Sequence, residues 1–155
     1  MTLDEFFDIG VTVTLGSHTF TAEAIKTFAA KYDPQPFHLD EEKARGSVFG
    51  RLCASGWHTT ATWMRYNLAQ QEEGGKRWPG PGPAPEFGPS PGFKNLKWLK
   101  PVYAGETITF TRTGLSHRPI ASRPGWRLLT LRAEAFDAIG DKVMEFESAV
   151  LVKAG

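Results

Sequence analysis

The residues best suited to chemistry are an aspartate and a histidine, Asp33 and His38, at the two ends of segment 33–38, which reads DPQPFH. Each proline fixes its own φ and moves the residue before it out of helical geometry, so this segment should form a rigid turn. A carboxylate and an imidazole that share one water can take a proton from it and deliver a proton to a carbon atom. Either residue alone has an ordinary structural explanation in a turn; together they favour acid–base catalysis.

A second candidate follows in segment 50–59, GRLCASGWHT, where Ser55 and Gly56 mark the expected start of a helix. The first N–H groups of a helix are unpaired and lie at the positive end of its dipole, so the Gly56 N–H is suited to stabilising an enolate oxygen. The alternative is that Gly56 allows the helix start to pack closely against a sheet. Ser55 is expected to cap the helix, because no G-x-S-x-G elbow surrounds it.

Segment 33–38, together with segment 96–107, LKWLKPVYAGET, resembles the MaoC-like dehydratases and R-specific enoyl-CoA hydratases. The signatures of that family read approximately D-x-N-P-[aliphatic]-H and F-x-x-P-V-x-x-G-D-T, and the resemblance covers most of the chain. It implies the hotdog fold and the reversible addition of water to a trans-2-enoyl-CoA, giving an R-3-hydroxyacyl-CoA. It also implies an acyl-CoA thioester as substrate without a further cofactor, and an oxyanion role for Gly56.

Two residues depart from the first signature: Gln35 stands where the family has Asn, and Phe37 stands where it has a smaller aliphatic side chain. The longer amide of Gln35 should alter the hydrogen bond that orients the aspartate or the histidine. The ring of Phe37 should shorten or reshape an acyl pocket. We expect these two residues, with Ser55 and Trp57 beside the glycine, to contact the substrate.

Composition indicates one domain spanning residues 1–155, with a formal net charge of +1 that gives no reason to expect nucleic acid or an anionic membrane as a partner. The single cysteine, Cys53, excludes an internal disulfide and is expected to be a buried, inert thiol. No Cys/His cluster has zinc spacing, so no metal is expected. The acidic N-terminus lacks a signal-peptide pattern and no segment is long enough to span a membrane, which favours a soluble cytoplasmic protein.

The pattern of apolar residues predicts an α+β fold in which one antiparallel sheet wraps around a central helix. A short strand at 11–15 precedes a helix that Thr21 caps and Pro34 ends, with its apolar face at Ile25, Phe28, Ala29 and Tyr32. One further helical turn is expected at 40–44. The central helix begins near Ser55, and its predicted buried face comprises Trp57, Thr60, Ala61, Met64 and Leu68.

Beyond the central helix, the Gly- and Pro-rich segment 74–92 predicts a long loop, in which Trp78 and Phe87 are available to cover an acyl tunnel. Four strands are then predicted, at 93–99, 107–116, 127–136 and 143–152. His58 is expected to be a packed or interfacial histidine. The cations available for coenzyme A phosphates are scattered, and spacing does not select among Arg45, Arg51, Lys94, Lys97, Lys100, Arg118 and Arg123.

The exposed edges of a single small sheet, and the family resemblance, imply a homodimer or a larger homo-oligomer with active sites at the dimer interface. Two other functions stay open at this point. One is thioester hydrolysis, whose carboxylate generally lies on or near the central helix, whereas segment 59–71 contains no acidic residue. The other is a non-catalytic module that binds acyl-CoA or lipid, which the departure at Gln35 keeps open.

Overall fold

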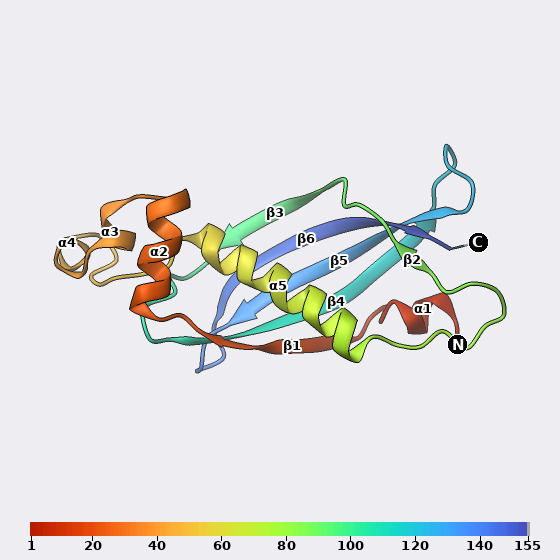
Figure 1. The fold of residues 1–155 in the computed structure, drawn as a ribbon, viewed down its shortest axis with the longest axis horizontal. Coiled ribbons are helices and arrows are strands. Elements are labelled where there is room, and N and C mark those ends of the chain that lie inside the picture. The colour runs from red at the N-terminus through yellow and green to blue at the C-terminus, as the bar shows by residue number, and fades with distance from the viewer. Residues whose placement is uncertain (155) are drawn as a thin grey trace.

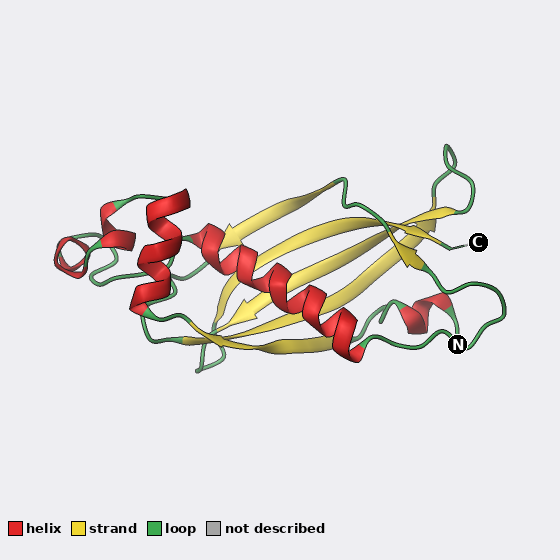
Figure 2. Ribbon diagram, in the orientation of Figure 1, coloured by secondary structure: helices red, strands yellow, loops and turns green. Residues whose placement is uncertain are grey.

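A helix of 19 residues, α5 (Gly56–Gly74), lies across one face of a curled antiparallel sheet in the computed structural model, which describes residues 1–154 (Figures 1 and 2). The sheet order is β1-β4-β5-β6, and β3 and β2 both pair with the outer edge of β6. This arrangement confirms the predicted α+β class and the sheet wrapped around a central helix. The strands are β1 (Thr12–Thr19), β2 (Glu86–Phe87), β3 (Gly92–Trp98), β4 (Thr107–Pro119), β5 (Trp126–Phe136) and β6 (Lys142–Lys153).

The remaining helices lie at the two ends of α5 (Figure 1). Helices α2 (Ala22–Tyr32), α3 (Pro36–Leu39) and α4 (Glu41–Arg45) gather where α5 begins, whereas α1 (Leu3–Phe6) lies near its end. The Thr21 hydroxyl caps α2 as predicted, by accepting a hydrogen bond from the Ala24 N–H. Segment 33–38 is only partly a turn, because Pro36 occupies the first position of the one-turn helix α3, where a proline needs no N–H partner.

The four predicted strands after the loop are confirmed, and β4, β5 and β6 supply most of the core. Alternating positions of β5 are buried as expected, at Leu129, Leu131, Ala133 and Ala135. The indole of Trp63 lies at the centre of the core, fully buried, and its N–H donates to the Thr111 carbonyl oxygen at 2.8 Å. This bond fixes α5 on β4 without leaving a buried donor unpaired.

Helix α5 does not bury the face that its sequence pattern predicts. Trp57, Met64 and Leu68 are 48%, 40% and 51% exposed, and Ala61 is exposed as well. The face turned to the sheet instead carries three polar residues and one tryptophan: Thr59, Thr62, Trp63 and Asn67. Because the helix is apolar toward solvent and partly polar toward the sheet, the hydrophobic pattern indicates the wrong face. The prediction for Tyr32 on α2 is also wrong, since that side chain is 63% exposed at the last turn of its helix.

His58 is packed, as predicted, between α5, α2 and the end of β1. Its ring stacks on Phe28 with a centroid distance of 4.5 Å and meets the edge of Phe20 at 5.0 Å. Its Nδ1 atom is buried without a hydrogen-bond partner among residues 1–154. Burial lowers the pKa of His58 from 6.5 to about 4, and the nearby His18 contributes in the same direction. The folded protein therefore holds this imidazole neutral.

Replacing His58 with leucine should flatten the acid side of the stability profile. Between pH 6.5 and about 4 the unfolded chain binds a proton at this histidine and the folded chain does not, so acidification favours unfolding. Linkage limits the effect to at most about 3 kcal/mol over that interval. Urea unfolding at several pH values between 4 and 7 should show a shallower slope for His58→Leu than for the wild type. Parallel slopes would contradict a neutral, buried His58.

Candidate active site

The structure brings Asp33 and His38 together at the end of the molecule where α5 begins. Asp33 follows the last residue of α2, and His38 lies on α3. The His38 Nε2 atom lies 3.4 Å from the Asp33 Oδ2 atom, with the imidazole buried and the carboxylate partly exposed. The two prolines between them turn the chain so that both side chains face the same point. Segment 33–38 therefore has the geometry needed for two groups to share one small molecule such as water.

The orientation of the His38 ring is fixed by a backbone carbonyl. The Nδ1 atom lies 2.6 Å from the Cys53 carbonyl oxygen, which can only accept, so Nδ1 carries the proton of this hydrogen bond. The Cys53 N–H in turn donates to the Phe37 carbonyl oxygen at 3.2 Å. With Nδ1 held in this way, Nε2 is the ring nitrogen that remains free to exchange a proton, and it faces Asp33.

The Cys53 backbone is itself held against segment 100–106. The Ala54 N–H donates to the Val102 carbonyl at 2.8 Å, and the Ala104 N–H donates to the Leu52 carbonyl at 3.1 Å. These bonds flank an antiparallel bridge between Cys53 and Tyr103. Cys53 therefore contacts both segments that carry the family resemblance. Segment 96–107 supports the Cys53 backbone, and the Cys53 carbonyl orients His38 of segment 33–38.

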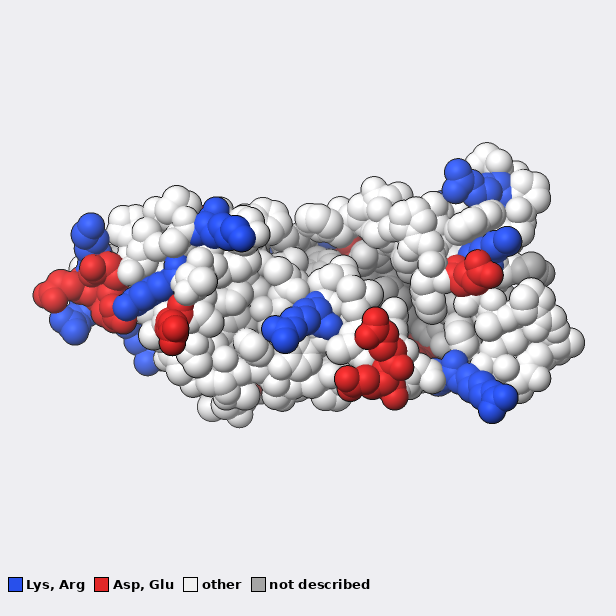
Figure 3. All heavy atoms as spheres, viewed as in Figure 1, with Lys and Arg blue, Asp and Glu red and all other residues white. Residues whose placement is uncertain are grey.

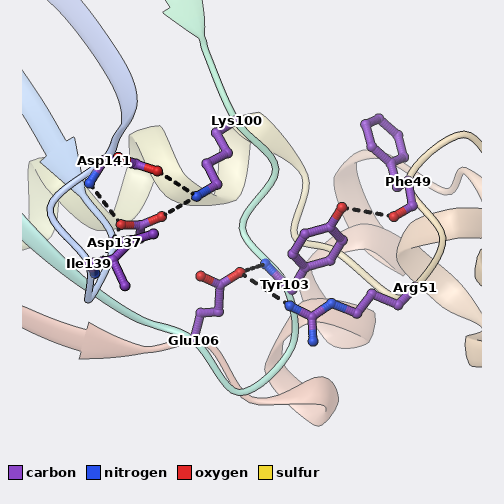
Figure 4. Close-up of polar contacts among 8 residues, drawn as sticks. All are labelled: Phe49, Arg51, Lys100, Tyr103, Glu106, Asp137, Ile139 and Asp141. Carbon is purple, nitrogen blue, oxygen red and sulfur yellow. Dashed lines mark hydrogen bonds and ion pairs between the residues drawn. The ribbon is translucent and has the colours of Figure 1, made fainter.

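Side chains fasten segment 100–106 on both of its sides (Figure 4). The Tyr103 hydroxyl donates to the Phe49 carbonyl at 2.8 Å, and the Arg51 guanidinium lies 4.0 Å from the centre of the Tyr103 ring. At the other side the Lys100 ammonium contacts Asp137 at 2.7 Å and Asp141 at 3.0 Å, in the turn between β5 and β6. Through the contacts of Lys100, segment 100–106, which supports the candidate site, is held against the β5–β6 turn of the sheet.

Gln35 and Phe37, the two departures from the family signature, both lie against the pair. The Gln35 amide N–H donates to the Asp33 Oδ1 atom at 2.6 Å, which leaves the Oδ2 atom directed at His38. The Phe37 ring meets the His38 ring edge to face at 4.6 Å and packs on Phe49 at 4.9 Å. The longer glutamine amide thus reaches back to orient the aspartate, and Phe37 covers one side of the imidazole.

The first turn of α5 leaves one N–H without a partner. The Ser55 hydroxyl accepts from the Trp57 N–H at 3.2 Å, and the Ser55 carbonyl accepts from the N–H groups of His58 and Thr59. The predicted cap is confirmed, and Ser55 is buried. Within residues 1–154 the Gly56 N–H makes no hydrogen bond. Gly56 lies three residues beyond the Cys53 carbonyl that holds His38, a chain length of at most about 10 Å.

Trp98, at the end of β3, packs directly on Gly56. A β-carbon on Gly56 would lie 2.2 Å from the Trp98 Cδ2 atom, a distance that no side chain tolerates. The Trp98 indole N–H donates to the Thr60 hydroxyl at 3.1 Å, and Trp57 meets its ring edge on at 4.9 Å. Close packing therefore accounts for a glycine at position 56 in this chain. Sequence reasoning did not find Trp98, because its spacing from the glycine carries no signal.

The remaining candidates lie elsewhere or are inert. Trp78 and Phe87 of the long loop pack against Phe6 of α1, near the end of α5 that is remote from His38 in the same chain. Burial raises the pKa of the Cys53 thiol to about 11, so it stays protonated at neutral pH. No group of three or more His, Cys, Asp and Glu residues that could hold a metal occurs in residues 1–154. None of the described helices combines the length and apolar character needed to cross a membrane.

Comparisons with known proteins agree with the predicted resemblance. A family model described as a MaoC like domain matches residues 7–120. The chain is 29% identical to the uncharacterized protein YdeM of Bacillus subtilis (strain 168) over 153 residues, which is 99% of each chain. Among solved structures it is similar to the MaoC-like dehydratase from Rhodospirillum rubrum, with 34% identity, a TM-score of 0.78 and coverage of 95% of this chain and 93% of that one.

The fold is also that of the (R)-hydratase from A. caviae involved in PHA biosynthesis. That structure is 23% identical to the chain, with a TM-score of 0.66 and coverage of 95% of this chain and 96% of the other. At this level of identity the likeness concerns the fold alone. Together with the Rhodospirillum structure, it confirms the hotdog-type arrangement predicted from the sequence.

A double-mutant cycle should separate the packing role of Gly56 from any other. Gly56→Ala should displace the Trp98 ring and lower the free energy of unfolding by about 1–3 kcal/mol, the usual cost of overpacking. In a Trp98→Ala background the same change should cost less than about 1 kcal/mol, since the colliding ring is gone. Urea unfolding of the four chains measures both values. Equal costs in the two backgrounds would show that the ring does not constrain position 56.

Proposed function

Because this chain belongs to the MaoC-like domain family, we propose that it catalyses the reversible hydration of a trans-2-enoyl-CoA to an R-3-hydroxyacyl-CoA. The observation that carries the proposal is the pairing of Asp33 with His38, whose Nε2 faces the carboxylate because the Cys53 carbonyl occupies Nδ1. One water beside the pair, at the apex of a triangle with Oδ2 and Nε2, would contact both groups.

In the proposed hydration, Asp33 accepts a proton from this water while the oxygen bonds to C3 of the enoyl group. His38, protonated at Nε2, delivers its proton to C2, so that one hydroxyl and one proton are added across the double bond. The proton on Asp33 then returns to Nε2, and the pair is restored. The Nδ1–H bond to Cys53 persists in both states of the ring, so the imidazole keeps its orientation throughout. Dehydration follows the same steps in reverse.

Gly56 is the proposed donor to the thioester oxygen. Addition at C3 places negative charge on that oxygen before C2 is protonated, and a fixed N–H at a helix start stabilises such a charge. The support is that this N–H alone is left without a partner in the first turn of α5. Trp98 lies over Gly56 and would form one wall of the approach. Gln35, Phe37, Ser55 and Trp57 are the proposed contacts for substrate.

Thioester hydrolysis has less support from the central helix. The acidic residues of α5 are Glu72 and Glu73, both in its last turn and therefore remote from the candidate site. The carboxylate that this reaction generally uses lies on or near the central helix, and segment 59–71 contains no acidic residue. We therefore assign the pair to water addition.

We also propose that two copies of the chain associate through the exposed apolar face of α5 and the free edge of β3. A large apolar surface of this kind is unusual on a monomer, and an unpaired edge strand favours pairing with another chain. β3 pairs with β6 on one side only within the described residues. The exposed large apolar residues of α5, of β3 and of the position after β3, which together we name the apolar face, are Trp57, Met64, Leu68, Phe93, Trp98 and Leu99.

Asp33→Asn and His38→Ala should each lower the turnover of trans-2-enoyl-CoA substrates by about 10²–10⁴-fold with folding retained, because a positioned proton-transfer group contributes that much. The assay follows the loss of enoyl absorbance with crotonyl-CoA and with longer chains. Wild-type rates in either variant would refute the assigned role. Absence of turnover by the wild type across chain lengths would leave a binding module as the function.

A second Asp–His contact in the same chain supplies the matched control for this experiment. The Asp4 Oδ1 atom lies 2.6 Å from the His117 Nε2 atom, where α1 meets the sheet at the opposite end of the molecule. Asp4→Asn and His117→Ala make the same chemical changes as the test variants outside the candidate site. We expect both to keep wild-type turnover.

The dimer should appear by light scattering at micromolar concentration as a mass about twice that of the 17.1 kDa chain. Leu68→Glu places a charge within the apolar face and should shift the protein to the monomer, because an unpaired charge in an apolar interface is costly. Ile139→Glu, at a still more exposed apolar position in the β5–β6 turn, is the control and should stay dimeric. A monomeric wild type would exclude the proposed association.

A further inference from the structure

Loop 46–50, which follows α4, is held by hydrogen bonds that lie almost entirely within the loop and its junction with α4. The Ser47 N–H and hydroxyl both donate to the Ala44 carbonyl, and the Ser47 hydroxyl accepts from the Phe49 N–H at 3.2 Å. In the described part of the chain, one hydrogen bond joins this loop to a distant segment. It runs from the Tyr103 hydroxyl to the Phe49 carbonyl, at 2.8 Å (Figure 4).

Apart from Phe49, packing does little to hold loop 46–50 in place. Helix α4 buries only Ala44, and charged side chains of both signs gather on the surface at that end of the molecule (Figure 3). Val48, in the middle of the loop, is 92% exposed, and Gly50 has a φ of 77°, which favours glycine. A segment with so few buried contacts opens locally at little cost in free energy. Its position therefore depends on the bond to the Phe49 carbonyl.

Tyr103, which makes this bond, is anchored independently of the loop. Its backbone N–H donates to the Glu106 Oε1 atom at 2.9 Å, and the Arg51 guanidinium lies 4.0 Å from the centre of its ring. Its backbone also forms the antiparallel bridge with Cys53. The tyrosine is therefore the fixed partner of the bond, and loop 46–50 is the partner that moves when the hydroxyl is lost.

The loop reaches the candidate active site through two aromatic rings. The Phe49 ring packs on Phe37 at 4.9 Å, and the Phe37 ring meets the His38 imidazole at 4.6 Å. These rings cover one side of the imidazole, which is 5% exposed. Exclusion of water from that side strengthens the 2.6 Å hydrogen bond between His38 Nδ1 and the Cys53 carbonyl. The place of the Phe49 ring therefore bears on the orientation of the imidazole.

We propose that Tyr103 is a positioning residue, whose hydroxyl holds the Phe49 ring where it keeps the His38 imidazole covered and oriented. The inference rests on the proposed hydration, in which His38 delivers the proton to C2. The Tyr103 hydroxyl is occupied by the Phe49 carbonyl, so it acts on the reaction only through loop 46–50. Loss of the hydroxyl therefore slows proton transfer and leaves substrate binding nearly unchanged.

Tyr103→Phe tests the role, because it removes the hydroxyl and keeps the ring beside Arg51. We expect kcat for enoyl-CoA hydration to fall about 5- to 10-fold, the rate equivalent of one net hydrogen bond, with KM changed by less than about twofold. Hydrogen exchange followed by mass spectrometry should show the amides of loop 46–50 exchanging about tenfold faster, with segment 100–106 unchanged. Wild-type kcat, or wild-type exchange in the loop, would overturn the proposal.

Tyr66→Phe is the matched control. The Tyr66 hydroxyl also donates to a backbone carbonyl, that of Ser17, at 3.0 Å. Tyr66 lies on α5 about 15 Å along the helix axis from Gly56, outside the candidate site. We expect this variant to keep the wild-type kcat. An equal loss of kcat in both variants would show a general effect of losing a hydroxyl and would count against a specific role for Tyr103.

Phe49→Leu separates the ring from the bond, because it keeps the carbonyl that Tyr103 contacts. It should lower kcat by about the same factor as Tyr103→Phe, while loop 46–50 exchanges at the wild-type rate. Adding Tyr103→Phe to this variant should then lower kcat by less than about twofold further, since both changes act through one ring. Losses that multiply in the double variant would overturn the route through Phe49.

Nuclear magnetic resonance of the His38 side chain tests the inference without turnover. The Nδ1–H proton should exchange with water about tenfold faster in Tyr103→Phe than in the wild type, because the loosened loop admits water to the ring. Unchanged exchange of this proton would refute the positioning role. Because the readout needs no substrate, it decides that role even where a wild type without turnover has refuted the proposed function.

Discussion

The hydrogen bond from His38 Nδ1 to the Cys53 carbonyl is the constraint on which the candidate chemistry depends. It fixes the tautomer of the ring, and with it the nitrogen that faces Asp33. The carbonyl can serve in this way only because its own segment is paired with segment 100–106, whose position is set by the contacts of Tyr103 and Lys100. The geometry of the Asp33–His38 pair, where α2 is followed by α3, thus depends on contacts made with the sheet.

Helix α5 runs between the two ends of the molecule, and its polar and apolar faces are the reverse of those usual for a helix that covers a sheet. Its inner face carries Thr59, Asn67 and Gln70, whereas Met64 and Leu68 face outward. Polar groups beneath a helix are stable only where each finds a partner, and Asn67 and Gln70 find theirs in Arg112. Apolar groups on the outside are stable only where something covers them. The same helix therefore begins at the candidate active site and, in its second half, holds Arg112 of β4 through Asn67 and Gln70.

Much of the fold follows from local sequence signals with a direct physical cause. The cap at Ser55, the strand alternation of β5 and the glycine- and proline-rich loop are each set by residues within a few positions, so they are readable from the chain. The juxtaposition of Asp33 and His38 was also predictable, since two prolines restrict the intervening backbone. The face of α5 was not, because periodicity identifies an apolar stripe and does not say whether the sheet or another chain covers it.

Contacts between distant segments were beyond sequence reasoning. The role of Cys53 resides in its carbonyl, which every residue possesses, and so leaves no trace in residue type. The packing of Trp98 on Gly56 joins positions on a strand and a helix with no fixed spacing. The assembly of Arg112 with Asp8 and Lys76 likewise depends on how α1 and the loop after α5 come together.

The bridge between Cys53 and Tyr103 also determines the order in which parts of the candidate site form during synthesis. During synthesis Leu52 and Ala54 leave the ribosome about fifty positions ahead of Val102 and Ala104, their backbone partners. Until then the His38 ring has no fixed acceptor, since the carbonyl that orients it is itself unanchored. Contacts of such sequence separation form slowly relative to local turns. The helices around Asp33 are thus able to form early. The His38 ring acquires its fixed orientation only after the second half of the chain has been made.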